Sequence, residues 1–238
     1  MMREFELILD PVTVPPLLVA NISVNTPVDF CPESLLIDHD VAGDFLVTDI
    51  KCRYDSQLIS RGGLPGLLFS DAALIERFSF DALKAGDRMM ISVINHAKED
   101  RVFAGCVKGE RGKGIQKGRR RYALGCSSTR VVGKSAANIN VMPQLAFKPD
   151  RLVIPSLIRE NFEIQDIFFT NGGVRESLDA GLLSQPFMEH TTGRLEFSRS
   201  VCPATFLSVA VRNISDSDLN FQAAILGFSV LEEIVPSR

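Results

Sequence analysis

The 238-residue chain is 45% hydrophobic and 23% charged, a composition typical of a folded protein with a proper core. Its formal net charge of -3 excludes a general attraction to nucleic acid, so any such contact needs a local basic cluster. Sixteen Phe against two Tyr and no Trp disfavour the exposed aromatic platforms of sugar-binding and base-stacking proteins.

The first residues, 1–17, precede the self-similar part of the chain, and we expect them to form an N-terminal arm. Acidic residues such as Glu4 and Glu6 interrupt the apolar positions, so the segment lacks the order of a signal peptide. No apolar run reaches the ~18 residues of a membrane-spanning helix. The five cysteines are scattered without a C-x-x-C pair, which favours synthesis in a reducing cytosol.

The chain then repeats itself. A shift of 117 positions places residues 20–22 (Ala-Asn-Ile) on residues 137–139, and the matches continue in order. After a slip of one residue they extend to Gly109 on Gly227. Other residues of the first half that are identical to their matches in the second half include Phe30, Pro32, Leu35, Ile37, Phe45, Asp49, Ile50, Arg77, Phe80, Asn95, Asp100 and Phe103. Because chance poorly explains an ordered series with one gap, we expect two copies of one unit, at 18–109 and 136–230, and a C-terminal tail at 231–238.

Each unit reads as all-β. Segments such as 151–154, 162–168 and 207–211 are short, partly alternating and rich in β-branched and aromatic residues, and turn-forming residues separate them. Strand-like runs recur about every ten residues, which is the spacing of a sandwich or barrel. The sequence therefore predicts two tandem jelly-roll-like β-sandwiches related by internal duplication. An immunoglobulin-like sandwich is the structural alternative, although it would usually carry a core Trp.

The segment between the units, 110–135, is expected to be a linker and is strongly basic. Glycines interleave its first half, so it begins as a flexible loop. One interpretation is a solvated linker. The other is a surface that faces phosphate, in nucleic acid or lipid head groups. The residues of this predicted basic cluster are Arg111, Lys113, Lys117, Arg119, Arg120 and Arg121.

No catalytic, cofactor or metal site is predicted, and we expect a protein that is not an enzyme. The three histidines fall at unrelated positions of the two units, and none has the spacing of a metal site. Residues 38–40 (Asp-His-Asp) are more typical of an exposed turn. Gly105-Cys106 and Gly125-Cys126 resemble thiol sites only superficially, since cysteine in strands usually serves as small core packing.

The layout resembles the double jelly-roll major capsid proteins of tailless, often membrane-containing bacteriophages. The resemblance rests on the tandem repeat, on a Phe-x-Pro-x-x-Leu-x-Ile pattern at 30–37 and 147–154, and on Phe-x-x-x-Asp-Ile at 45–50 and 162–167. It implies a subunit with two jelly rolls side by side, made in the host cytoplasm and located in the virion. Three subunits would form a pseudo-hexameric capsomer of an icosahedral shell, in contact with other capsid proteins.

Two further hypotheses stay open. The first is a tandem β-sandwich binding module, either another virion or tail component or a carbohydrate-binding adhesin. The second is a duplicated β-barrel enzyme of the cupin type, which would need metal ligands that the sequence does not offer.

Overall fold

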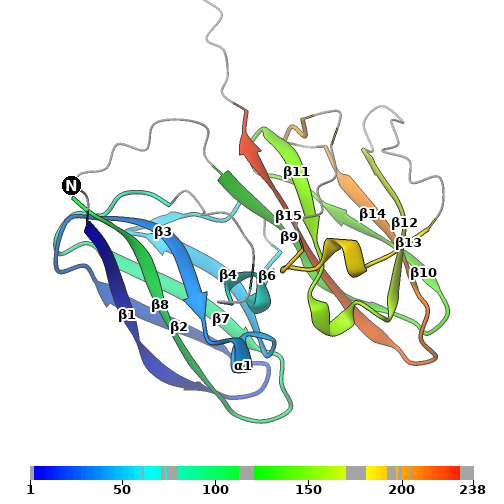
Figure 1. Cartoon of the computed structure of the whole chain (residues 1–238), viewed down its shortest axis with the longest axis horizontal. Coiled ribbons are helices and arrows are strands. Elements are labelled where there is room, and N and C mark those ends of the chain that lie inside the picture. The colour runs from blue at the N-terminus through cyan, green and yellow to red at the C-terminus, as the bar shows by residue number, and fades with distance from the viewer. Residues whose placement is uncertain are drawn as a thin grey trace, which may run out of the picture.

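The computed structural model describes residues 3–59, 62–70, 73, 80–112, 121–169, 181–191, 197, 200–203 and 205–230. Strands dominate these residues, and they form two β-sandwich units along the chain (Figure 1). Among the described residues, no helix is both long and apolar enough to cross a membrane. In the described ranges the helical elements are one short α-helix, α1 (His39–Ala42), and three 3-10 turns, η1 (Gly66–Phe69), η2 (Ser156–Ile158) and η3 (Gln185–Phe187).

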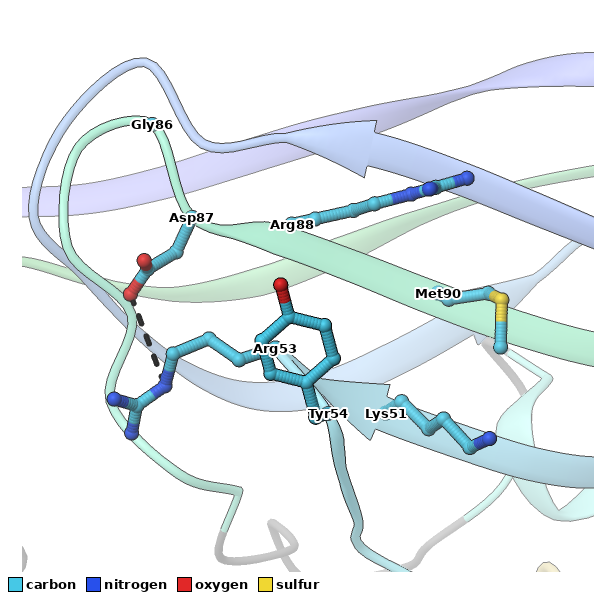
Figure 2. A pocket seen from close by; sticks show the side chains of 7 residues that line it. All are labelled: Lys51, Arg53, Tyr54, Gly86, Asp87, Arg88 and Met90. Carbon is cyan, nitrogen blue, oxygen red and sulfur yellow. Dashed lines mark ion pairs between the residues drawn. The ribbon is translucent and has the colours of Figure 1, made fainter.

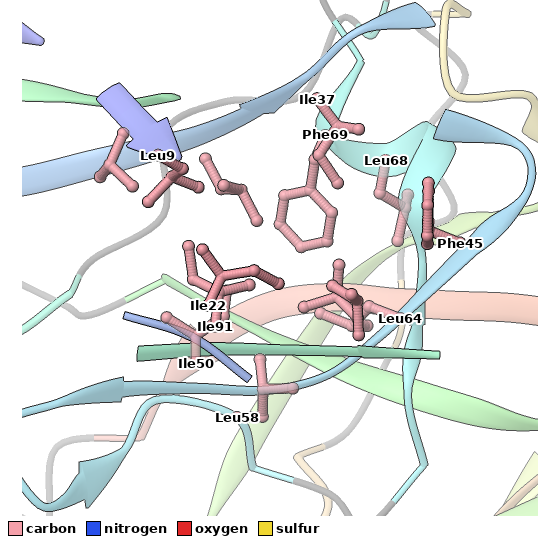
Figure 3. Close-up of a cluster of buried hydrophobic side chains, with 14 of the residues drawn as sticks. Leu9, Ile22, Ile37, Phe45, Ile50, Leu58, Leu64, Leu68, Phe69 and Ile91 are labelled. Atoms are coloured by element: carbon pink, nitrogen blue, oxygen red, sulfur yellow. The ribbon is translucent and has the colours of Figure 1, made fainter. Parts of the chain in front are cut away.

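The first unit is a sandwich of two antiparallel sheets. One sheet has the order β1-β8-β3, and the other has the order β2-β7-β4-β5, with β6 also paired to β4. The strands are β1 (Arg3–Val14), β2 (Val19–Asn25), β3 (Phe30–Ile37), β4 (Phe45–Cys52), β5 (Asp55–Ser56), β6 (Leu64–Pro65), β7 (Arg88–Asn95) and β8 (Arg101–Arg111). Figure 3 shows how Leu9 and Ile37 of the first sheet meet Ile22, Ile50 and Ile91 of the second in a common core.

The second unit repeats this arrangement. Its sheets have the orders β9-β15-β11 and β10-β14-β12-β13. The strands are β9 (Arg121–Val131), β10 (Ala136–Val141), β11 (Phe147–Val153), β12 (Phe162–Phe169), β13 (Leu182–Leu183), β14 (Leu207–Asn213) and β15 (Leu219–Ser229). The predicted all-β fold of two tandem jelly-roll-like sandwiches is confirmed, because sequence-distant strands pair in the same order in both units.

The repeated Phe-x-Pro pattern marks a β-bulge. The pairing of β3 with β8 shifts register between Pro32 and Ser34, and the pairing of β11 with β15 shifts between Pro149 and Arg151. A bulge leaves one residue out of the ladder, and proline is tolerated there because it has no N–H to donate. The pattern is therefore a feature of strand geometry.

The phenylalanine of the same pattern explains a repeated glycine. Phe30 and Phe147 are fully buried. A Cβ on Gly109 would lie 2.9 Å from the Phe30 ring, and a Cβ on Gly227 would lie 2.8 Å from the Phe147 ring. Each glycine thus leaves room for the aromatic ring and the crossing strand.

Each of the two cores contains an edge-to-face pair of phenylalanine rings at matching positions. The rings of Phe45 and Phe103 meet edge to face at 5.2 Å between centroids, and those of Phe162 and Phe221 do so at 5.1 Å. Each pair joins the two sheets of its unit, since one ring comes from each sheet. Edge-to-face contact is a favoured arrangement for aromatic rings in a dry core.

A buried asparagine also recurs with the same bonds. The Asn95 side chain donates to the carbonyl oxygens of Val14 (2.7 Å) and Glu99 (2.8 Å). In the second unit Asn213 donates to the oxygens of Val131 (3.0 Å) and Ser217 (2.8 Å). Both asparagines are 0% exposed, so these bonds satisfy main-chain groups that water cannot reach.

The unit boundaries differ from those expected. Residues 3–14 of the expected N-terminal arm form β1, which pairs with β8 inside the first sandwich. Residues 121–131 of the expected linker form β9, the matching strand of the second sandwich. β1 exposes Glu4, Glu6 and Asp10 on alternate positions, whereas most of β9 is buried and its two charged residues, Arg121 and Arg130, lie near its ends. Residues 113–120 and the predicted tail, 231–238, lie outside the described part of the chain.

Candidate assembly surface

The two units contact each other through the outer face of the β9-β15-β11 sheet (Figure 1). Ala123, Val153, Ala224 and Leu226 on this face are at most 3% exposed and belong to the hydrophobic core of the first unit. Alternate residues of the same strands belong to the core of the second unit. Both faces of this sheet are therefore buried, and the junction between the units is continuous and apolar.

The first unit receives this face on β6 and on the two glycines before it. β6 contacts both β9 and β15. A Cβ on Gly125 of β9 would lie 2.4 Å from the carbonyl oxygens of Gly62 and Gly63, so the two main chains meet at the closest distance that glycine allows. A backbone hydrogen bond from the Gln144 amide to the Ile59 oxygen, 2.9 Å long, also crosses the junction.

The junction joins two different surfaces of the same fold. The second unit contributes the outer face of its three-stranded sheet, and the first contributes the short strand at the side of its other sheet. Such a contact is heterologous, or head-to-tail. It leaves the corresponding three-stranded sheet of the first unit on the far side of the molecule (Figure 1).

A groove of about 230 Å³ runs along the junction. Gly43, Phe45 and His96 line it from the first unit, and Leu157 and Gln222 from the second. A Cβ on Gly43 would lie 2.6 Å from Leu157 Cδ1, which makes this a second point of close approach. Burial lowers the pKa of His96, so its imidazole is neutral at neutral pH.

The predicted basic cluster divides in the structure. Arg111 ends β8 and is exposed, whereas Arg121 begins β9 and is only 6% exposed. Arg121 Nη2 lies 3.4 Å from Asp150 Oδ2, and its guanidinium lies 4.7 Å from the centre of the Phe228 ring. Arg121 is therefore part of the folded sheet and does not face outward. Four members lie outside the described residues: Lys113, Lys117, Arg119 and Arg120.

A second basic surface surrounds a pocket of about 420 Å³ on the first unit. Lys51, Arg53 and Arg88 line it together with Tyr54, whose side chain is 95% exposed. Figure 2 shows Arg53 reaching toward Asp87, with its Nε 3.9 Å from Asp87 Oδ2, and Arg88 extending the opposite way. The pocket could hold a small anion beside an aromatic ring.

The Asp-His-Asp turn at 38–40 has a structural role. The Asp38 side chain accepts a hydrogen bond from the Asp40 amide, 3.0 Å long, and caps α1. Within the described ranges, no group of three or more His, Cys, Asp or Glu side chains could hold a metal ion.

The cysteines of the two Gly-Cys pairs both have raised pKa values. Burial raises the pKa of Cys126 to about 12, and its side chain is 0% exposed. Burial raises that of Cys106, as does the charge of Glu6 to a smaller extent. Both thiols are therefore protonated at neutral pH and are poor nucleophiles.

We expect a maleimide reagent at neutral pH to label the exposed Cys202 rapidly and to leave Cys126 unlabelled until the protein is unfolded. Mass spectrometry of peptides from native and urea-treated protein measures both sites. The Cys202→Ser variant is the control, because it should lose only the fast label. Rapid labelling of Cys126 in the native protein would contradict this burial.

The junction was not predicted from the sequence, although one signal of it exists. The end of β15, residues 222–227, reads Gln-Ala-Ala-Ile-Leu-Gly, with small or apolar side chains on both faces of the strand. A strand buried on both faces has this composition, whereas a sandwich strand with one face in water alternates. The contact of Gly62 and Gly63 with Gly125 depends on tertiary structure and leaves no local pattern in the sequence.

The known proteins that resemble this chain are solved structures. No family model matches the chain, and no curated protein matches its sequence. The crystal structure of the major capsid protein P2 from Bacteriophage PM2 aligns over 98% of this chain and 99% of that chain, with 9% sequence identity and a TM-score of 0.41. A likeness of this size does not assign the chain to a family.

Proposed function

We propose that the chain is a structural capsid protein whose copies assemble into the shell of a virion. Three copies close into a ring of six similar sandwiches, a pseudo-hexamer, and these rings tile the shell. The protein is made in the host cytoplasm and ends in the virion beside other capsid proteins. The proposal assigns it no catalytic role.

The observation that carries the proposal is the head-to-tail junction between the two units. A contact between two different surfaces does not terminate itself, because each added unit presents a fresh copy of one surface. Repeated by rotation, it closes into a ring; repeated without closure, it gives a filament. Six similar units in a ring require three chains of two units each.

The character of the junction also supports a building block with a fixed shape. Residues of the second unit lie inside the hydrophobic core of the first, and glycines bring the main chains together. Interfaces that are apolar and closely packed resemble a divided domain core and are permanent. The two sandwiches are therefore expected to move as one body, as a tile of a closed shell requires.

A tandem binding module is the second candidate, and the pocket in Figure 2 favours it. The positions of Lys51 and Arg88 correspond to Phe168 and Phe206 in the second unit, so the pocket is not a requirement of the fold. Tyr54 beside three cationic side chains would suit a ligand with an anionic group. A role of the basic stretch in contacting nucleic acid or membrane head groups would rely on exposed residues such as Arg111.

Electron microscopy of the purified protein at rising concentration tests the proposal. We expect closed particles or flat arrays of tiles with six-sided outlines. A field of single, two-lobed molecules at every concentration would contradict the capsid function and favour the binding module.

A further inference from the structure

The first unit exposes the same sheet face that the second unit buries in the junction. Gly125, Ala224 and Val153 form a row across β9, β15 and β11, and the corresponding row across β1, β8 and β3 is Ile8, Cys106 and Leu36. The matching row has a very different exposure: Gly125 is buried, whereas Ile8 is 73% exposed. The outer face of the β1-β8-β3 sheet is thus one free half of the junction.

The second unit exposes the strand that the first unit uses to receive that face. In the first unit Leu64 pairs with Val47; in the second, Leu182 pairs with Ile164 at the corresponding place. Leu64 is 1% exposed and its neighbour Pro65 is buried. By contrast, Leu182 is 39% exposed and Leu183 is 50% exposed. β13 is thus the other free half of the junction.

The glycine before each of these strands supports the correspondence. A Cβ on Gly63 would lie 2.6 Å from the side chain of Leu46, and a Cβ on Gly181 would collide with the side chain of Glu163, the residue at the corresponding place of β12. Gly63 is buried beneath the second unit, whereas Gly181 is exposed. Segments 63–65 and 181–183 therefore present the same local surface, covered in one case and bare in the other.

From these two free halves we propose that the outer face of the β1-β8-β3 sheet of one copy packs on β13 of a second copy of this chain. The inference rests on the proposed function, because it names the surfaces through which the copies join. The contact within the chain shows which surface packs on which, because the outer face of the second unit's three-stranded sheet already packs on β6 of the first unit. Each copy then contacts one neighbour through its β1-β8-β3 sheet and a second neighbour through its β13.

The contact between copies is more polar than the contact within the chain. Leu226, fully buried in the junction, corresponds to Lys108, and Leu46 on the receiving side corresponds to Glu163. Glu4, Glu6 and Glu110 lie beside Lys108 on the same sheet, so the charge of Lys108 is already balanced within its own copy. Lys108 also pairs with Glu6 of its own sheet, at 2.9 Å. Ile8 is at the position that Gly125 holds in the second unit. The contact between copies therefore forms through the Ile8 side chain, whereas the main chains touch at Gly125 within the chain.

Two single variants test the inference, one on each half. Ile8→Glu places a charge on the sheet face, and Leu183→Lys places one on β13. Both native side chains are at least half exposed, so neither change disturbs the core of the chain. We expect each variant alone to run as a monomer in size-exclusion chromatography with light scattering. Tyr54→Glu and Val132→Lys, at the exposed positions of two turns, are matched controls that should assemble as the unchanged chain does.

Mixing the two variants gives the sharper result. The Leu183→Lys chain keeps a working sheet face, and the Ile8→Glu chain keeps a working β13, so an equimolar mixture can form one proper contact. We expect a one-to-one dimer and no larger species.

Either variant assembling like the unchanged chain, or a mixture that stays monomeric, would overturn the assigned surfaces while the capsid function could still hold. Failure of the unchanged chain to assemble at any concentration would instead remove the proposed function, and the inference with it.

Discussion

Replacing Gly125 by valine lowers the free energy of unfolding by about 3 kcal/mol. The added side chain would begin 2.4 Å from the carbonyl oxygens of Gly62 and Gly63 and 2.9 Å from the Gly62 carbonyl carbon. These are main-chain atoms, so they cannot rotate away as the end of a side chain could. The two units must separate or the strands must bend, and either change opens a junction in which Ala224 and Leu226 are fully buried. Urea unfolding followed by circular dichroism measures the loss.

The corresponding residue of the first unit supplies the control. Ile8→Ala changes a side chain at the same place of the sheet, but one that is 73% exposed, and it should alter the stability of the single chain by less than about 1 kcal/mol. A loss of stability at Gly125 as small as the loss at Ile8 would contradict the junction described above, because it would mean that Gly125 does not lie in a closely packed contact.

Truncating one ring of either aromatic pair has the other large effect. We expect Phe103→Ala and Phe221→Ala each to cost about 3–5 kcal/mol, because each ring is fully buried and its removal leaves a cavity between the sheets. The partner rings, Phe45 and Phe162, lose their edge-to-face contacts at 5.2 and 5.1 Å. Thermal or urea unfolding of both variants measures the two losses.

The stability losses of Phe103→Ala and Phe221→Ala should also agree with each other, and this agreement tests whether the two cores match. The pairs occupy matching strands of the two units, so their costs should be similar to within about 1 kcal/mol. Phe206→Ala is the control, since that ring is 42% exposed and lies outside the core. A negligible cost at one of the two buried positions would contradict the matching of the two cores.

Residues that recur at matching positions of the two halves made the fold predictable, because the same physical constraints act at those positions. Pro32 and Pro149 lie at bulges, and Gly109 and Gly227 leave room for buried rings. Each constraint depends on the local strand geometry, so it leaves the same residue type in both halves.

β1 and β9 were missed for the opposite reason. Each begins a unit and pairs with a strand about one hundred residues later, such as Leu7 with Val107 and Leu124 with Ile225. No local pattern reports so distant a partner.

The candidate surface could be predicted only in part. The basic residues of the middle segment are visible in the sequence, but only the structure shows that Arg121 lies against Phe228 and Asp150. The assembly surface was invisible because Gly125 and Ile8 are different residues at one structural position. The two positions indicate an assembly surface only when the structure shows that Gly125 is buried and that Ile8 is exposed.

The mass of the purified chain in solution, measured by size-exclusion chromatography with light scattering at low and high salt, tests the central claim most directly. The account predicts a stable species of three times the mass of one chain, or larger closed particles built from it. High salt should leave the association largely intact, since exposed apolar residues such as Ile8 and Leu183 form the free halves. A monomer at high protein concentration under both conditions would contradict the claim that this chain builds a shell.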